Sequence, residues 1–305
     1  MLANQKGMAL ITVLLVTALV AMLAVSMSFA QHVAVRRTAN LLEGDQAMVL
    51  ALGLEEWGRW VLNRDSKGSD NLGENWAMGL PPTAVENGVV SGSFVDMQGR
   101  INLNNLVLGS SNEIAQAEQM LEQLYEDCEA DNGAFLVRAV ADWLDDDSNP
   151  RPGGAEDNEY LLHEPAYLAA NRPMTSPSEL LLIEGFTPEI YLCVKEHVAA
   201  LPGPTKINLN TAGPVVISTL SPGLSVAAAE EIVMARPDDG YASIADFLAD
   251  PALAGTGINP DGLSLTSGYF MARARAVFGE AEVELYTLFS RTTLVEVVAR
   301  SIGTY

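Results

Sequence analysis

The densest group of reactive side chains in the sequence is an acidic segment spanning residues 142–159. It holds seven carboxylates, one basic residue, Arg151, and a turn rich in proline and glycine. Carboxylates this close together repel one another unless they are solvated or share a cation, and Ca²⁺ takes oxygen ligands in flexible loops. The segment therefore predicts a calcium site without EF-hand spacing, and a solvated acidic loop is the alternative. The predicted ligands are Asp142, Asp145, Asp147, Glu156, Asp157 and Glu159.

Paired carboxylates can also catalyse reactions, so an enzymatic role for this segment has to be weighed. Glycosidase and aspartic-protease chemistry needs two carboxylates whose pKa values are held apart by their surroundings. The segment has no apolar surroundings of that kind, and the histidines His32, His163 and His197 have no visible nucleophile partner. The sequence also lacks Gly-x-Ser-x-Gly, Walker and zinc motifs. We therefore predict that the protein is not an enzyme.

The chain has two cysteines, Cys128 and Cys193. They form no Cys-x-x-Cys pair and no cluster with histidine, so a zinc site is not expected. Both fall in one predicted domain, and an exported protein allows a disulfide to persist. The two residues are therefore candidates for a disulfide, and two unpaired buried thiols are the alternative.

A second candidate binding module runs from residue 207 to residue 236. Its Ile-Asn-Leu-Asn-Thr-Ala start, the turn around Gly223 and the helical pattern that follows resemble the helix-hairpin-helix of competence-type DNA-binding proteins. However, Ser225 stands where a second glycine is usual, and Arg236 is the one base among six acidic residues between 213 and 250. Phosphate binding needs the opposite charge. We predict a packing module and no nucleic-acid partner, with a membrane-anchored DNA-uptake protein as the alternative.

The start of the chain differs sharply from the body that carries these sites. Residues 1–42 contain no acidic residue, whereas residues 43–305 carry all 39 acidic residues and 14 of the 17 basic residues, a formal charge of −25. From Met8 to Ala30 the chain has 23 residues and no charge, and about 20 such residues suffice for a helix to cross a bilayer. The sequence indicates an apolar anchor joined to an acidic body.

Three interpretations of this start differ in where the chain is cut. A secretory signal peptide would be cleaved after Ala30 and leave a secreted calcium-binding protein. An uncleaved signal anchor would keep the whole segment. A type IV prepilin leader would end at Lys6-Gly7, so that cleavage leaves Met8 as a methylated amino terminus. The apolar run is longer than the core of a usual signal peptide, which favours the prepilin pattern.

Several phrases in the body resemble one known family. A predicted strand at 88–96 leads into Gln-Gly-Arg-Ile-Asn-Leu-Asn-Asn-Leu at 98–106, and a related phrase recurs at 206–212. Between them lie Gly-Ala-Glu-Asp at 154–157 and Ala-Ala-Asn-Arg-Pro at 169–173. In this order, after a prepilin-like leader, the phrases resemble the K-type minor pseudopilins of type II secretion systems, the general secretion pathway protein K family.

The resemblance implies an α+β fold, with a pilin-like long N-terminal helix packed on a small antiparallel sheet and a large inserted helical (SAM-like) domain. The two Ile-Asn-Leu-Asn phrases would then stand close together at the entrance and exit of the insert. The implied division is a leader at 1–7, a transmembrane helix at 8–30, a first pilin-like part at 31–105, an inserted acidic α-domain at 106–205, and a second pilin-like part at 206–305 with a helical hairpin module at 213–250.

The resemblance also implies a function. The chain would be a minor pseudopilin at the tip of the periplasmic pseudopilus, helping to initiate its assembly and the export of folded proteins. Its partners would be the I-type and J-type minor pseudopilins, through them the H-type and the major pseudopilin, and the prepilin peptidase. It would cross the bacterial inner membrane once, with its body in the periplasm. Members of the family bind Ca²⁺ in the inserted domain, which supports the predicted site.

Thr12 would occupy the fifth position of the mature chain, where pilin-like proteins usually carry glutamate and the K type does not. A glutamate within hydrocarbon is kept only when it is paired, and in pilin-like fibres it meets the terminal amine of a neighbouring subunit. A subunit at the tip has no such amine to neutralise, and a threonine hydroxyl can bond to a helix carbonyl instead. Thr12 therefore fits the first subunit of a fibre.

Periodicity predicts the elements of the body. The N-terminal helix should continue to residue 64 and pack through an apolar stripe formed by Leu41, Met48, Val49, Leu52, Trp57 and Trp60. Strands are expected at 88–96, 269–278, 282–290 and 293–300. Helices are expected at 112–127, 134–144, 180–183, 188–199, 214–220 and 225–236.

Overall fold

The structure is a computed structural model that describes residues 6–65, 68–130, 132–292 and 294–303. Its first element is helix α1 (Lys6–Arg64). The predicted leader, residues 1–7, therefore lies outside the described residues except for its last two positions, which belong to the first turn of α1.

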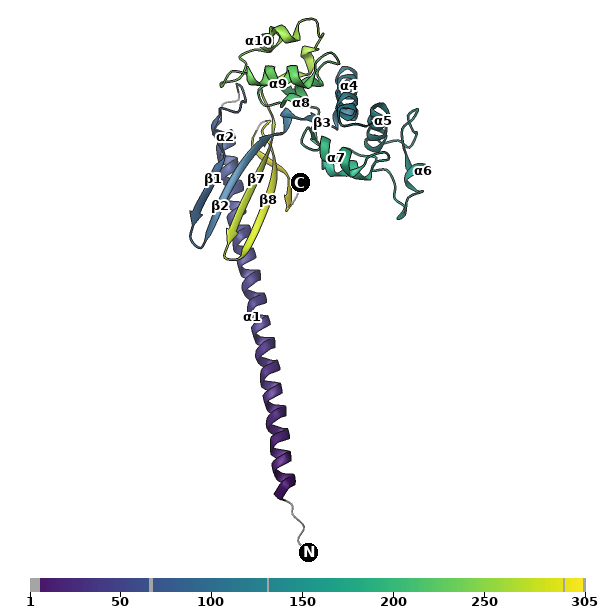
Figure 1. Ribbon diagram of the computed structural model, residues 1–305. Helices are drawn as coiled ribbons and strands as arrows, with labels where there is room; N and C mark the ends of the chain where they lie inside the picture. Colours follow the sequence, from purple (N-terminus) through teal and green to yellow (C-terminus); the bar gives the residue numbers. More distant parts are fainter. Residues whose placement is uncertain (1–5, 66–67, 131, 293, 304–305) are drawn as a thin grey trace.

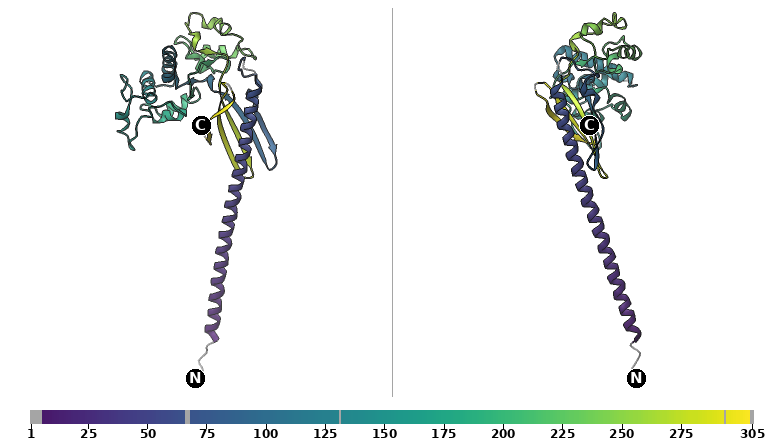
Figure 2. Two further views of the ribbon diagram at one scale, coloured as in Figure 1. Left: turned by 180° about the vertical axis from the view of Figure 1, so that it is seen from behind. Right: turned by 90° about the vertical axis from the view of Figure 1, so that its left-hand side faces the viewer.

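Helix α1 is one rod of 59 residues that carries the rest of the molecule at its far end (Figure 1). No proline precedes residue 81, so the backbone keeps its helical hydrogen bonds over about 88 Å. The first half of α1 stands clear of the body, and the second half lies along the sheet in both views of Figure 2. Among the described helices, α1 is the one that is long and apolar enough to cross a membrane.

The face of α1 that packs on the sheet combines small residues with buried leucines. Ala47 and Ala51 are fully buried there, and a Cβ atom on Gly58 would lie 2.8 Å from the Phe94 ring. Larger apolar residues fill the rest of this face, where Leu54 and Leu62 are buried. The predicted apolar stripe is only partly the buried face: Trp57 packs against the core beside Phe94, whereas Leu41, Val49 and Trp60 are exposed.

A five-stranded antiparallel sheet covers one side of the second half of α1, in the order β1-β2-β7-β8-β9. The predicted strands at 88–96 and 269–278 are confirmed, and the last strand starts three residues later than predicted. Strand β1 escapes prediction because it begins Leu-Pro-Pro, and proline is tolerated in a strand at a sheet edge such as this one. The elements are α2 (Asn75–Met78), β1 (Leu80–Val85), β2 (Gly88–Asp96), β7 (Tyr269–Phe278), β8 (Ala281–Ser290) and β9 (Glu296–Ile302).

A long helical insertion separates the neighbouring strands β2 and β7. Asp96 lies opposite Phe270 in their pairing, so residues 97–268 leave the sheet and return to it at the same end, away from the N-terminus (Figure 1). The predicted α+β class, a long helix on an antiparallel sheet with a helical insert, is thereby confirmed. The insertion contains η1 (Met97–Gly99), β3 (Ile101–Asn102), α3 (Asn105–Leu108), α4 (Ser111–Asp127), α5 (Gly133–Leu144), α6 (Asp157–Tyr160), η2 (Pro177–Leu182), α7 (Pro188–Val194), β4 (Val198–Ala199), β5 (Ile207–Asn208), α8 (Pro214–Ser218), α9 (Val226–Met234), α10 (Ile244–Leu248), η3 (Pro251–Leu253), η4 (Pro260–Gly262) and β6 (Leu263–Ser264).

The two Ile-Asn-Leu-Asn phrases fold in the same way. Each contributes a two-residue strand that pairs in parallel with a returning segment, β3 with β4 and β5 with β6. In each phrase the second asparagine clamps a distant loop: the side-chain oxygen of Asn104 accepts from the Met174 N–H at 2.8 Å, and that of Asn210 from the Tyr241 N–H at 2.7 Å. The predicted helix at 188–199 is wrong beyond α7, because pairing with β3 draws residues 198–199 into a strand.

The entrance and exit of residues 106–205 are joined directly, since the Asn105 side chain accepts from the Thr205 N–H at 3.0 Å and donates to its carbonyl at 2.8 Å. The largest core runs through the whole insertion, from Ile101 to Leu263. It includes buried residues of α8 and α9, so the helical hairpin module shares one core with α4 and α5.

Candidate metal centre

The acidic segment is positioned by the end of α5 and by the turn that follows it. Asp142 is fully buried on the last turn of α5, and the backbone becomes extended at Asp145. The chain then returns through Gly153, whose φ of +78° favours glycine, and Gly154, where a Cβ atom would lie 1.9 Å from the Asp142 carboxylate. This close turn brings Glu156, at the start of α6, back beside the end of α5.

Three of the six predicted ligands converge. One carboxylate oxygen from each of Asp145, Asp147 and Glu156 lies within 4.8 Å of the other two. The Glu156 side chain is completely buried, and neither of its carboxylate oxygens has a hydrogen-bond partner among the described residues. A buried carboxylate is normally paired or bound to a metal. The all-oxygen donor set and its spacing fit a hard cation such as Ca²⁺.

The other three predicted ligands have different partners. The Arg151 guanidinium donates to Asp142 at 2.6 Å and also pairs with Asp145. Asp157 accepts from the Ala169 N–H at 2.9 Å, and Glu159 accepts from the Glu156 N–H at 3.0 Å. These three carboxylates fix the loop around the cluster, and the structure does not bring them into it.

The electrostatics of the cluster depend on Glu156. Burial, together with the negative charges of Asp142 and Asp145, raises the pKa of the Glu156 carboxyl to about 7. Asp147 behaves in the opposite way, since hydrogen bonds from the backbone and side chain of Asn149 hold the pKa of its carboxyl below the usual value. The site therefore combines Glu156, whose raised pKa disfavours ionisation, with Asp147, whose lowered pKa favours it. A cation would stabilise the ionised form of both.

A second acidic group, Asp65, Asp70 and Glu74, has the same oxygen spacing and was not predicted. It holds its own cation: Arg291 donates to Asp65 at 2.6 Å and pairs with the fully buried Asp70. Glu74 accepts from the Trp76 indole N–H at 2.8 Å. We interpret this group as a structural ion-pair network. No local sequence signal could have found it, because Arg291 lies more than 200 residues away from the acids.

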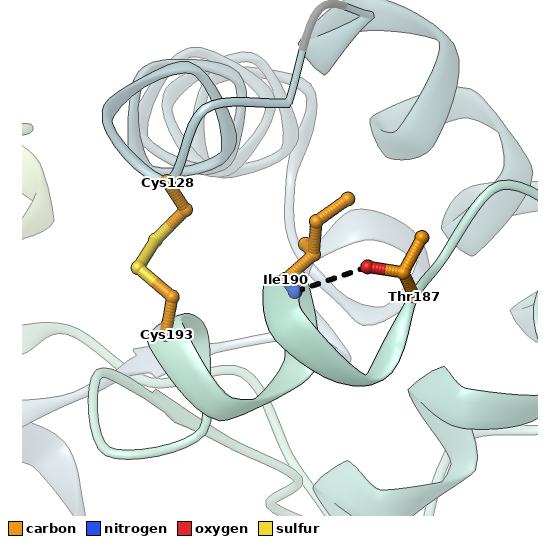
Figure 3. Close-up of a disulfide and its surroundings, with 4 residues drawn as sticks. All are labelled: Cys128, Thr187, Ile190 and Cys193. Carbon is orange, nitrogen blue, oxygen red and sulfur yellow. Dashed lines mark hydrogen bonds between the residues drawn. A yellow bond between two sulfur atoms is a disulfide. The ribbon is translucent and has the colours of Figure 1, made fainter.

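A disulfide joins Cys128, at the end of α4, to Cys193 in α7 (Figure 3). Their Cα atoms are 5.9 Å apart, and 65 residues separate them in the chain. Helix α7 is also capped at its start, where the Thr187 hydroxyl accepts from the Ile190 N–H at 3.3 Å. The bond therefore ties a short helix to the longest helix of the insertion.

Removing this disulfide should destabilise the insertion. We expect the double substitution Cys128→Ser and Cys193→Ser to lower its free energy of unfolding by about 3 kcal/mol, because the unfolded chain regains the freedom that the crosslink removes. Denaturant unfolding followed by tryptophan fluorescence, to which Trp143 of the insertion contributes together with three tryptophans outside it, measures the change. Reductant should destabilise the wild type by a similar amount and leave the double variant unaffected; an insensitive wild type would contradict the prediction.

The predicted functional residues of α1 lie at its exposed N-terminal end. The Thr12 hydroxyl donates back to the carbonyls of Met8, at 3.1 Å, and Ala9, at 2.9 Å. It is thus satisfied within the helix, as a polar side chain in an apolar surrounding has to be. Gly7 and Met8, the predicted cleavage position, lie in the first turns of α1.

The helical hairpin module uses its key residues for packing. Arg236 donates to the carbonyls of Asn210, at 2.9 Å, and Ala212, at 2.6 Å, so its guanidinium is held inside the module. Ser225, which replaces the usual second glycine, caps α9 by accepting from the Ala228 N–H at 3.2 Å. These contacts favour the packing role over phosphate binding.

A long N-terminal helix on an antiparallel sheet, with a helical insertion that carries an acidic site, defines a pilin-like protein with an added domain. Family models described as type II secretion system, protein K, match residues 99–203 and 207–266. The chain is 32% identical to the type II secretion system protein K of Klebsiella pneumoniae, over 99% of this chain and 98% of the relative. It is 34% identical to that of Pseudomonas aeruginosa, over 98% and 93%.

A solved chain from the GspK-GspI-GspJ complex of the enterotoxigenic Escherichia coli type 2 secretion system has a similar fold. The TM-score is 0.78 at 25% identity, over 88% of this chain and all of that chain. The protein belongs to the type II secretion system protein K family. It is therefore a structural component of a secretion system.

Proposed function

We propose that this protein is the minor pseudopilin at the tip of the periplasmic pseudopilus, where it helps to initiate assembly and the export of folded proteins. It would act together with I-type and J-type minor pseudopilins, and through them with the H-type and the major pseudopilin. The similarity to a chain from a GspK-GspI-GspJ complex supports the first two partners. Family membership favours this role over DNA uptake and over a secreted calcium-binding protein.

The position of the insertion carries the proposal. Residues 97–268 form a body at the end of the sheet that is far from the N-terminus of α1, and they extend to one side of it (Figures 1 and 2). In a fibre whose subunits align their N-terminal helices, a subunit stacked above this one would meet the insertion. At the tip no subunit is stacked above, so the insertion meets no obstacle.

The N-terminal helix supports the same position through charge. Thr12 satisfies its own hydroxyl within α1 and brings no carboxylate that would need a neighbour's amine. We infer that prepilin peptidase removes residues 1–7, that α1 anchors the chain in the bacterial inner membrane, and that the body lies in the periplasm. The disulfide is compatible with that oxidising compartment.

We also infer that Ca²⁺ bound by Asp145, Asp147 and Glu156 stabilises the insertion. Bound there, the ion would supply the positive partner that the buried Glu156 carboxylate lacks. The surrounding chain supplies the frame: Arg151 holds Asp142 and Asp145 in place, and Glu159 holds the start of α6.

Stoichiometry tests the tip position. We expect the full-length chain, extracted in detergent with the I-type and J-type pseudopilins, to purify at one copy per complex, because one fibre has one tip. Native mass spectrometry of the complex gives the count. Self-association of the chain into extended filaments, or several copies along one fibre, would refute the proposal.

Thr12→Glu tests the charge argument. At the tip the new carboxylate would have no amine partner within the membrane, so we expect secretion to fall severalfold. Thr12→Gln is the matched control, because it has nearly the same size without the charge and should secrete close to wild type. The measurement is the amount of exported protein in the medium of a strain that carries each variant. Improved secretion by Thr12→Glu would place the subunit in the shaft.

A further inference from the structure

A groove lies where the insertion meets the face of the sheet that α1 leaves open. The strand register places Ser93 of β2 and Tyr286 of β8 on either side of Arg273 of β7, and strand alternation turns these side chains away from α1. The opposite wall is α7 with the residues that follow it, including Tyr191 and Lys195. The hollow between the two walls has a volume of about 390 Å³.

The groove carries a small excess of positive charge, from Lys195, although the body is strongly acidic. Three basic side chains, Arg100, Lys195 and Arg273, line it together with one acidic side chain, Glu196. Glu196 lies 3.0 Å from Arg100, and Glu284 lies 2.6 Å from Arg273, whereas Lys195 has no ion pair with any described residue. In a body with a formal charge of −25, a lining with excess positive charge favours an acidic ligand.

The shape of the groove fits a length of chain better than a single ion. A second hollow of about 430 Å³ continues it along the sheet, shares Ser93 and Arg273 with it, and adds one basic and one acidic side chain, Arg275 and Glu284. Apolar and aromatic side chains lie between the charges, among them Val95, which is 40% exposed, and Tyr191. An extended segment that alternates acidic and apolar residues would match this lining.

The wall formed by α7 is held in place before any ligand arrives. Lys195 is the C-terminal cap of α7, and Cys193, two residues earlier, is bonded to the end of α4 (Figure 3). A preformed wall lowers the entropic cost of binding.

We propose that this groove is a docking site for an extended acidic segment of another protein. The segment would place its carboxylates beside Lys195, Arg100 and Arg273, and its apolar side chains against Val95 and Tyr191. This interaction does not depend on the position of the subunit in the fibre, and it would give the strongly acidic body a surface for an acidic partner.

The test uses the full-length chain in detergent micelles and a short fluorescein-labelled peptide in which glutamate and leucine alternate. Fluorescence anisotropy should detect binding at low ionic strength that weakens as salt is added. We expect Lys195→Glu to weaken binding about tenfold or more. Lys206→Glu is the matched control: Lys206 is exposed, lies outside the groove, and its reversal changes the net charge equally, so binding should be unchanged. Lys195→Gln should give an intermediate loss.

Several results would overturn the proposal. The groove is not the site if the glutamate peptide fails to bind, if it binds Lys195→Glu as tightly as wild type, or if a peptide with lysine in place of glutamate binds equally well. Light scattering separates another occupant: if the full-length chain dimerises and Lys195→Glu abolishes the dimer, the groove takes a second copy of this chain. Circular dichroism shows whether each variant keeps its helical content.

Discussion

Calcium is expected to raise the free energy of unfolding of the insertion by about 3 kcal/mol when free Ca²⁺ exceeds its dissociation constant about a hundredfold. The reason is that the folded state alone gathers Asp145, Asp147 and Glu156 within ligand distance. The measurement is thermal or denaturant unfolding of the full-length chain, after treatment with chelator and again with added calcium.

Substitutions at the site separate a bound ion from a general salt effect. The double variant Asp145→Ala and Asp147→Ala, and separately Glu156→Gln, should melt at the same temperature with and without calcium. Asp146→Asn is the matched control, because Asp146 is an exposed neighbour outside the cluster and its loss should leave the calcium response intact. A full calcium response in the double variant would locate the ion elsewhere.

The calcium effect should depend on pH in a defined direction. The pKa of Glu156 is raised to about 7 in the folded protein, so without metal this group stabilises the fold below about pH 4.5, and the contribution is lost as pH rises through 7. The rise of this pKa from 4.5 to about 7 corresponds to a loss of about 3 kcal/mol in the free energy of unfolding. Calcium binds the ionised carboxylate, so its stabilisation should grow over the same interval.

Burial also raises the pKa values of Asp70, Asp96 and Glu74. Ionisation of these groups at higher pH therefore also lowers the free energy of unfolding of the metal-free protein. The Glu156 contribution is therefore the difference between wild type and Glu156→Gln across the pH series. If the two curves stay parallel between pH 4.5 and 8, Glu156 does not titrate as proposed.

Processing before Met8 is the second change with a large expected effect. We expect the mature chain to start at Met8 with one added methyl group, and Gly7→Leu to leave the leader uncut and abolish secretion. The uncut leader keeps Lys6 next to the apolar end of α1, where burial of a charge against neighbouring helices is costly. Intact mass spectrometry of the membrane-extracted protein reports the start of the chain.

A matched substitution separates this cut from signal-peptide cleavage. Ala30→Leu removes the small residue that signal peptidase would need and should leave the processed mass and secretion unaltered. A mature chain that begins at Gln31 would instead restore the secretory signal peptide and remove the anchor from the proposed function.

Local patterns in the sequence determined much of this molecule. The uncharged run from residue 8 to residue 30 and the lack of proline specify α1, because hydrogen bonds within a helix need only neighbouring residues. Alternation specifies β2, β7 and β8, because the side-chain period of a strand is itself local. The presence of two cysteines in the chain indicated a candidate crosslink. The crowding of carboxylates within residues 142–159 indicated a candidate cation site, because neighbours in sequence stay close in space.

Tertiary structure decided everything that depends on which distant residues meet. It set which side of α1 is buried: Gly58 faces Phe94 so closely that a Cβ atom would not fit, and Leu54 and Leu62 fill other parts of the same face. It drew Val198–Ala199 into a strand through parallel pairing with β3, which lies about 100 residues earlier in the chain. It brought three of the six carboxylates together, because the turn through Gly153 and Gly154 returns Glu156 to Asp145 and Asp147. The other three bond to Arg151 or to backbone N–H groups. It also assembled the groove around Lys195 from strands and a helix about 100 residues apart in the chain. Local sequence patterns carry no information about contacts at that separation.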